Sequence, residues 1–290
     1  MLRPDFLQDA SIKRWLAGMD PVWTLLGRES LTALYSRPSA GDGAIQLASD
    51  LSDGELNQSA IARNAIILLR AAANDQGLKL TATGNLTRQV VAQMIELFVW
   101  PDFDKDKAFV LHKVINEPDF LPLFFTRHLV QFGRLIKPRK DYLRATPAGR
   151  DMLATGGAQS LQAQLFNLAF WSLDLSYLSR GRHDGWPQKD IGVILWSLSI
   201  AANEWRTREQ LTRMCSVPNA AIVTSDFDLG TYAVDGMVLR PLLWFGLLEH
   251  RSEETPDQKF VKQHFYRKTP LFDRFLSFDI RVNVPSNQRH

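Results

Sequence analysis

Apolar residues recur at helical spacing over several stretches of the chain. One such pattern runs through 61–72 and stops at the Asn-Asp-Gln-Gly segment 74–77, which has the residue types that end helices. A short extended piece, 78–86, follows, and the helical period resumes over 90–98. The pattern predicts a helix, a strand, a turn and a second helix in this order.

A predicted hairpin follows a strongly apolar helix near the middle of the chain. The helix covers 120–132 and ends at Gly133. Two short strands, 135–136 and 142–144, flank a turn that begins with proline, and Thr146-Pro147 has the sequence of a helix start.

A similar block recurs near residue 240. The expected elements are a helix over 237–245, Gly246, a strand at 247–248, a turn at 252–258, a strand at 260–266 and a last helix opened by Thr269-Pro270. Phe-Gly-Arg-Leu-Ile (132–136) and Arg-Ala-Thr-Pro (144–147) correspond to Phe-Gly-Leu-Leu (245–248) and Arg-Lys-Thr-Pro (267–270). The two blocks are therefore predicted to be copies, with two apolar helices, 161–178 and 189–205, between them.

A helix that ends in aromatic-Gly, then a hairpin and a Thr-Pro helix start, resembles the wing region of winged-helix proteins. The resemblance covers 121–153 and 238–276, although Phe272 stands where the family pattern has glycine. It implies a mainly α fold with small β-hairpin wings, built from tandem winged-helix-like modules plus a helical N-terminal cap. The segment 78–86 also resembles uncharacterised bacterial and plasmid-borne proteins, a likeness that implies no activity.

Glycine and proline mark the expected domain boundaries. The Pro/Gly/Ser-rich stretch 36–42 is a predicted linker, and Gly156-Gly157 separates the two blocks. We expect an N-terminal helical cap and linker over 1–55, a first winged-helix-like domain over 56–155 and a second over 158–290.

The first block carries a concentration of basic residues. In DNA-binding winged-helix proteins the helix before the wing enters the major groove and basic wing residues contact phosphates. Between Arg134 and Arg150 six positive residues accompany only one acidic residue, Asp141. The predicted nucleic-acid-binding set is Arg127, Gln131, Arg134, Lys137, Arg139, Lys140, Arg144 and Arg150. The alternative is an ordinary solvated surface, because basic hairpin turns are common.

The second block lacks such a patch. Its helix has Arg240 as its only charged residue, and its hairpin mixes Lys259 and Lys262 with three acidic residues. An apolar helix in this position suits packing against protein. The prediction is therefore a protein partner, or a homodimer, bound through the second unit.

Composition limits the function classes. Hydrophobic residues make up 45% and charged residues 22% of the chain, as in folded globular proteins, and 34 basic against 31 acidic residues give a net charge of only +3. An anionic partner would thus be held by local patches. The single cysteine, Cys215, predicts a reducing, cytoplasmic setting, and the longest apolar run, 191–202, falls short of the ~20 residues of a membrane span.

Motifs for metal or catalytic chemistry fail on spacing. Asp102 to Asp106 begin like a calcium loop, but lysine occupies the glycine position at 107 and the bidentate glutamate position at 113. The segment from Asp226 also fails, because Met237 occupies its twelfth position. No two histidines stand three or four residues apart. His183-Asp184, flanked by Arg180 and Arg182, is the one place where a base adjoins a carboxylate, and an ordinary loop is favoured there. We expect no metal, no cofactor and no enzymatic activity.

The functional prediction is a non-enzymatic DNA-binding or DNA-associated regulatory protein that uses the first winged-helix unit. The alternative is a scaffold subunit of a larger complex, in which both units bind protein. An enzyme assembled from residues far apart in the sequence stays open as a third class.

Overall fold

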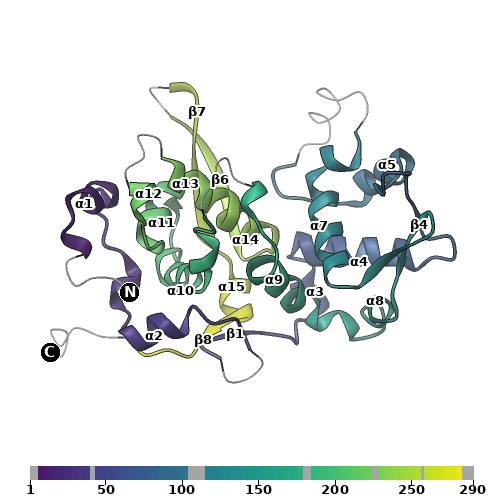
Figure 1. The fold of residues 1–290 in the computed structure, drawn as a ribbon, viewed down its shortest axis with the longest axis horizontal. Helices are drawn as coiled ribbons and strands as arrows, with labels where there is room; N and C mark the ends of the chain where they lie inside the picture. Colours follow the sequence, from purple (N-terminus) through teal and green to yellow (C-terminus); the bar gives the residue numbers. More distant parts are fainter. Residues whose placement is uncertain are drawn as a thin grey trace. The chain divides into compact units, whose positions relative to one another are not determined.

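The computed structural model describes residues 6–39, 43–103, 115–178, 184–223, 228–255 and 258–282, without the side chains of residues 221, 255 and 258–261. The chain forms two compact units (Figure 1). We call Ala48–Ala169 the insert unit, because Met1–Leu47 and Phe170–His290 on either side of it form the other one, the split unit. Both are mainly helical with small antiparallel sheets, as the apolar spacing predicts.

The insert unit begins with two helices, each capped by a serine side chain that accepts a backbone N–H. Its elements are α3 (Asp53–Leu56), α4 (Ala60–Ala73), β2 (Leu78–Lys79), α5 (Arg88–Leu97), a 3₁₀ turn (Glu117–Asp119), α7 (Leu121–Phe132), β3 (Ile136–Arg139), β4 (Tyr142–Ala145) and α8 (Pro147–Asp151). α9 (Leu161–Trp171) begins in this unit and ends in the split unit. The predicted hairpin and the Thr146 helix start are confirmed.

A three-stranded sheet in the order β2-β4-β3 covers the helices α4 and α7 of the insert unit. Leu143 at the centre of the sheet pairs with Leu78 on one side and Pro138 on the other. Leu143 is fully buried, as are Leu69 of α4 and Leu129 of α7. These side chains form the core of the unit, because each strand turns alternate residues toward the helices.

The split unit is assembled from both ends of the chain. From its first segment come α1 (Ala10–Leu16), a 3₁₀ turn (Val22–Leu25), α2 (Arg28–Ala33) and β1 (Ile45–Leu47). From its second come α10 (Ile191–Ala201), β5 (Arg206–Thr207), α11 (Arg208–Cys215), α12 (Ala220–Val223), α13 (Leu229–Val234), a π-helical turn (Asp235–Leu239), α14 (Arg240–Trp244), β6 (Leu248–Thr255), β7 (Gln258–Lys268), α15 (Pro270–Phe275) and β8 (Leu276–Phe278).

Buried contacts join the two segments of the split unit. β1 pairs with β8, and the indole of Trp23 donates a hydrogen bond to the carbonyl of Ser216 (3.0 Å). Gly192 of α10 lies against the Leu34 carbonyl so closely that a Cβ atom there would be 2.0 Å from the oxygen. Buried side chains of the first segment, among them Trp23, Leu34 and Ile45, thus belong to the core of this unit.

The second hairpin is longer than the sequence predicts. Its sheet has the order β5-β7-β6, and Ser252 to Thr255, expected in a turn, belong to β6. The pairing of β6 with β7 continues to Thr255, with an irregularity in the register after Glu254. Among the described residues, none of the helices combines the length and the apolar character needed to cross a membrane.

The two blocks correspond with a shift of one residue from the sequence alignment. Arg134 and Gly246 both adopt positive φ, 57° and 73°, directly after their helices. In both blocks the next amide, of Leu135 or Leu247, donates to the carbonyl five residues earlier (3.0 and 2.9 Å). This is the hydrogen bond of a Schellman ending. Arg134, and not Gly133, is therefore the counterpart of Gly246.

Replacing Arg134 by glycine is expected to stabilise the insert unit by about 1 kcal/mol, because a Cβ atom is disfavoured at positive φ. The gain in the free energy of unfolding is measured by urea unfolding, with hydrogen exchange of the α4 amides as the readout. Arg134→Ala is the control, since it removes the same charge and keeps the Cβ atom. Equal stability of the glycine and alanine variants would contradict the assignment of strain to this position.

Candidate nucleic-acid interface

The outer face of the β2-β4-β3 sheet gathers basic side chains from all three strands. Register places Lys79 opposite Tyr142, Tyr142 opposite Arg139, and Arg144 opposite Lys137. Residues directly opposite share a face, so these five lie on the side away from the core. The two lysines and Arg139 are exposed, and Tyr142 and Arg144 are half-buried. We call this set the cationic sheet face.

Like charges oppose one another on this face. Arg144 stands directly across from Lys137, an arrangement that destabilises an antiparallel pair by about 0.2–1 kcal/mol. Arg144 is held in place by donating to the Asp75 carbonyl (2.8 Å), and its guanidinium lies 5.8 Å from the Tyr142 ring centre. Within the described part of the chain, no ion pair involves the four cations of the face. A bound polyanion would relieve the repulsion.

Three other predicted basic residues lie beside the face. Lys140 occupies the two-residue turn of the hairpin with Asp141, and both are exposed. Arg134 is exposed at the end of α7, and Arg150 is exposed on α8, where it donates to the Ala73 carbonyl (3.3 Å). The structure thus places six of the eight predicted side chains on or near one hairpin.

Arg127 is placed differently. Its side chain is 8% exposed and forms an ion pair with Glu117, whose side chain is 1% exposed. It also donates to the Gly84 carbonyl (2.8 Å), while Glu117 accepts the amide of Leu86 (2.6 Å). Arg127 therefore fastens the 81–86 loop to α7 from inside the unit. It is not available to a phosphate, and we leave it out of the interface.

The face of α7 that stays accessible offers little to a base pair. Gln131 is half-buried, the ring of exposed His128 lies tilted against Phe124 (4.1 Å between centres), and Phe132 is 50% exposed. α7 contains no lysine and, apart from the buried Arg127, no arginine. The exposed cations near the hairpin are therefore on the sheet and its turn and not on the accessible face of α7.

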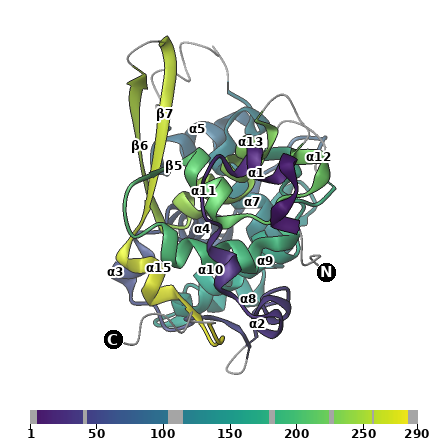
Figure 2. The same cartoon turned by 90° about the vertical axis from the view of Figure 1, so that its left-hand side faces the viewer.

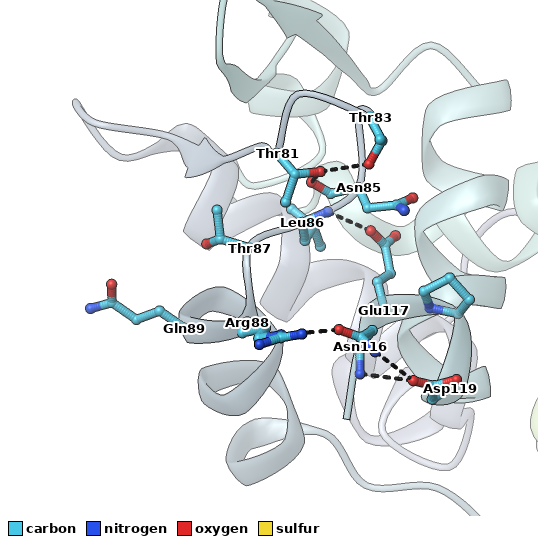
Figure 3. Close-up of a pocket in the computed structure, with 11 residues that line it drawn as sticks. Thr81, Thr83, Asn85, Leu86, Thr87, Arg88, Gln89, Asn116, Glu117 and Asp119 are labelled. Carbon is cyan, nitrogen blue, oxygen red and sulfur yellow. Dashed lines mark hydrogen bonds between the residues drawn. The ribbon is translucent and has the colours of Figure 1, made fainter. Parts of the chain in front are cut away.

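A polar pocket of about 740 Å³ opens beside the buried ion pair, between the loop 81–89 and residues 116–119 (Figure 3). Its polar groups bond to one another: Arg88 donates to Asn116 (3.2 Å), and Asn116 donates to Asp119 (3.0 Å). The carboxylate of Glu117 also lines it. Two carboxylates in the wall make the pocket unsuited to a phosphate.

Residues 57–158 match the family model described as the Y4jL N-terminal domain. The matched segment lies within the insert unit. Over 95 residues the chain is 35% identical to "Uncharacterized protein y4jL" of Sinorhizobium fredii (strain NBRC 101917 / NGR234). This matched segment makes up 33% of this chain and 43% of that protein. The chain thus matches less than half of the length of that relative, and no solved structure matches it. The predicted resemblance to an uncharacterised bacterial protein is confirmed for this segment.

The corresponding face of the split unit is electrically balanced. Trp205 lies between the guanidinium groups of Arg251 and Arg267, 4.7 and 4.9 Å from its ring centre. Glu253 pairs with Arg251 (3.4 Å), and Glu249 pairs with Arg267 (2.7 Å). Among the side chains that the structure describes, this face has no surplus positive charge, in agreement with the interpretation that the second unit does not contact a polyanion.

Two histidines of the same hairpin come together although the sequence separates them. His250 and His264 are hydrogen-bonded between ring nitrogens (2.9 Å). Burial, then the positive charge of Arg208, lowers the pKa of His264. In the described ranges no three His, Cys, Asp or Glu side chains are arranged to hold a metal ion. Cys215 is fully buried, which raises the pKa of its thiol.

Several positions considered in the sequence lie outside the described residues. They are residues 104–107 of the acidic loop, His112, Arg180, Arg182, His183, Asp226, Asp257 and the side chain of Lys259.

Proposed function

We propose that the insert unit is a winged-helix module that binds duplex DNA through its cationic sheet face. The element order supports the module: helix α4, strand β2, helices α5 and α7, then the hairpin β3–β4, with β2 completing the sheet. The split unit has the same order in α10, β5, α11, α14, β6 and β7, which supports a second module. The observation that carries DNA binding is the group of four cations on one sheet face.

The proposed contact is with the phosphate backbone. Lysine and arginine side chains on the sheet and at the hairpin turn neutralise phosphates, and each released counterion contributes to affinity. Such contacts position a protein on DNA without reading its sequence. The half-buried, mostly apolar surface of α7 fits this mode better than base recognition, so we expect binding with weak sequence preference.

A salt series on the whole chain tests the proposal. Affinity for a fluorescent duplex should fall steeply with salt, and Lys137→Ala with Arg139→Ala should reduce the slope of log K against log salt by about 2, near 0.9 for each lost phosphate contact. Lys13→Ala with Arg63→Ala removes the same charge away from the sheet and should leave the slope unchanged. Parallel slopes for the two double variants would exclude the sheet face as the binding surface.

A second candidate function rests on the split unit. Its balanced sheet face combines Trp205 with two arginines, the residue types that dominate protein interfaces. In this proposal the protein is a scaffold subunit that binds a protein partner or a second copy. No measurable duplex binding at low salt would favour the scaffold over the DNA-binding protein.

A further inference from the structure

The two hairpins differ in how their outer edges are protected. The edge strand of the insert unit, β3, contains Pro138, which lacks an N–H and discourages pairing with another strand. The edge strand of the split unit, β6, is eight residues long and contains no proline. Figure 2 shows β6 on the side of β7 away from β5, as the sheet order requires. Among the described residues, no strand pairs with the outer edge of β6.

The charges along β6 favour pairing with itself. Residues directly opposite in an antiparallel pair share a face, so a two-fold axis must pass through a residue of the strand. With Ser252 on the axis, Arg251 faces the partner's Glu253 and His250 faces the partner's Glu254. Each of these pairings occurs twice, so four favourable contacts lie within five residues of each strand.

Neighbouring registers are less favourable. With Arg251 on the axis, the two arginines face each other and Glu249 faces the partner's Glu253. With Glu253 on the axis, Arg251 faces the partner's Thr255 and no opposite charges meet. Moving the axis by one residue along the strand thus removes the complementarity, because like charges opposite one another are destabilising.

We propose that two copies of the chain form a dimer by antiparallel pairing of their β6 strands, with Ser252 on the two-fold axis. The dimer extends each three-stranded sheet into a continuous six-stranded one across the axis. Arg251 exchanges its bond to Glu253 of its own strand (3.4 Å) for the same carboxylate of the partner. This proposal does not depend on DNA binding by the insert unit.

Disulfide cross-linking of single-cysteine variants tests the register. Ser252→Cys brings two thiols face to face at the axis, at the Cα separation of an antiparallel pair, and should give a covalent dimer under mild oxidation. Arg251→Cys is the matched control, because its two copies are roughly 8 Å apart in this register, beyond disulfide reach. The native Cys215 is fully buried and does not compete. Cross-linking of Arg251→Cys in place of Ser252→Cys would overturn the register.

Sedimentation of the uncross-linked protein tests the dimer itself. Arg251→Glu places two carboxylates opposite each other and should weaken dimerisation at least tenfold. Adding Glu253→Arg reverses both partners and should restore the dimer, which a general loss of folding would not allow. A native protein that is monomeric at all concentrations tested, or a charge-swapped variant that stays monomeric, would overturn the proposal.

Discussion

Glu117→Ala is expected to lower the free energy of unfolding of the insert unit by about 3–5 kcal/mol, because it leaves the Arg127 guanidinium buried without its counter-ion. The same change removes the acceptor of the Leu86 amide. Such a loss approaches the whole stability of a small domain. Hydrogen exchange of the α4 and α7 amides measures it for this unit alone.

Two further variants distinguish the effect of breaking the ion pair on stability from the effect of removing a carboxylate. Asp119→Ala removes an exposed carboxylate from the same 3₁₀ turn and should cost no more than about 1–2 kcal/mol, as for a helix cap. Glu117→Leu with Arg127→Met replaces both charges by apolar groups and should recover much of the stability. A double variant as unstable as Glu117→Ala would show that the hydrogen bonds to the 81–86 loop, and not the unpaired charge, are decisive.

Gly192→Ala is expected to destabilise the split unit by about 1–3 kcal/mol. This is the opposite of what helix propensity alone predicts, because alanine is preferred over glycine within a helix by nearly 1 kcal/mol. The new Cβ atom would stand 2.0 Å from the Leu34 carbonyl oxygen and 2.7 Å from a methyl group of Ile45. The first segment of the split unit would have to move away from α10. Tryptophan fluorescence during urea unfolding reports this unit, which contains every tryptophan of the chain except Trp100.

Gly54 provides a control at the same position of another helix. Gly54 and Gly192 are each the second residue of their helices, α3 and α10, but nothing lies within 4 Å of a Cβ atom at Gly54. Gly54→Ala should therefore be neutral or slightly stabilising. Equal effects of the two substitutions would show that helix propensity, and not the approach of Leu34, governs Gly192.

Local signals in the sequence were sufficient for the hairpin of the insert unit and for the helix start after it. The hairpin from Ile136 to Ala145 and the helix start at Thr146 depend on residues within a few positions of one another, and both are present. The one-residue shift between the two blocks was not predictable from the sequence, because Arg134 adopts a positive φ angle that is typical of glycine. Only φ angles and hydrogen bonds reveal that correspondence.

The parts of the site that depend on distant contacts were not predictable. Helical spacing puts Arg127 on a stripe with Gln131 but cannot show that Glu117 neutralises it inside the unit. Lys79 joins the sheet face through a two-residue strand that pairs with Tyr142, 63 positions later, too short to give an alternating pattern. In the sequence, the strand is indicated only by the position of Lys79 between two leucines, Leu78 and Leu80, which the structure shows to be buried.

The split unit also sets the order of events during synthesis. Residues 170–290 are translated after the insert unit, and at ribosomal rates this takes about 6 to 24 s. During that interval the insert unit has all of its residues, whereas Trp23, Leu34 and Ile45 wait for the surfaces that bury them. A nascent chain therefore carries a completed insert unit behind an exposed apolar segment, the kind of surface to which chaperones bind, until residues 170–290 have been made.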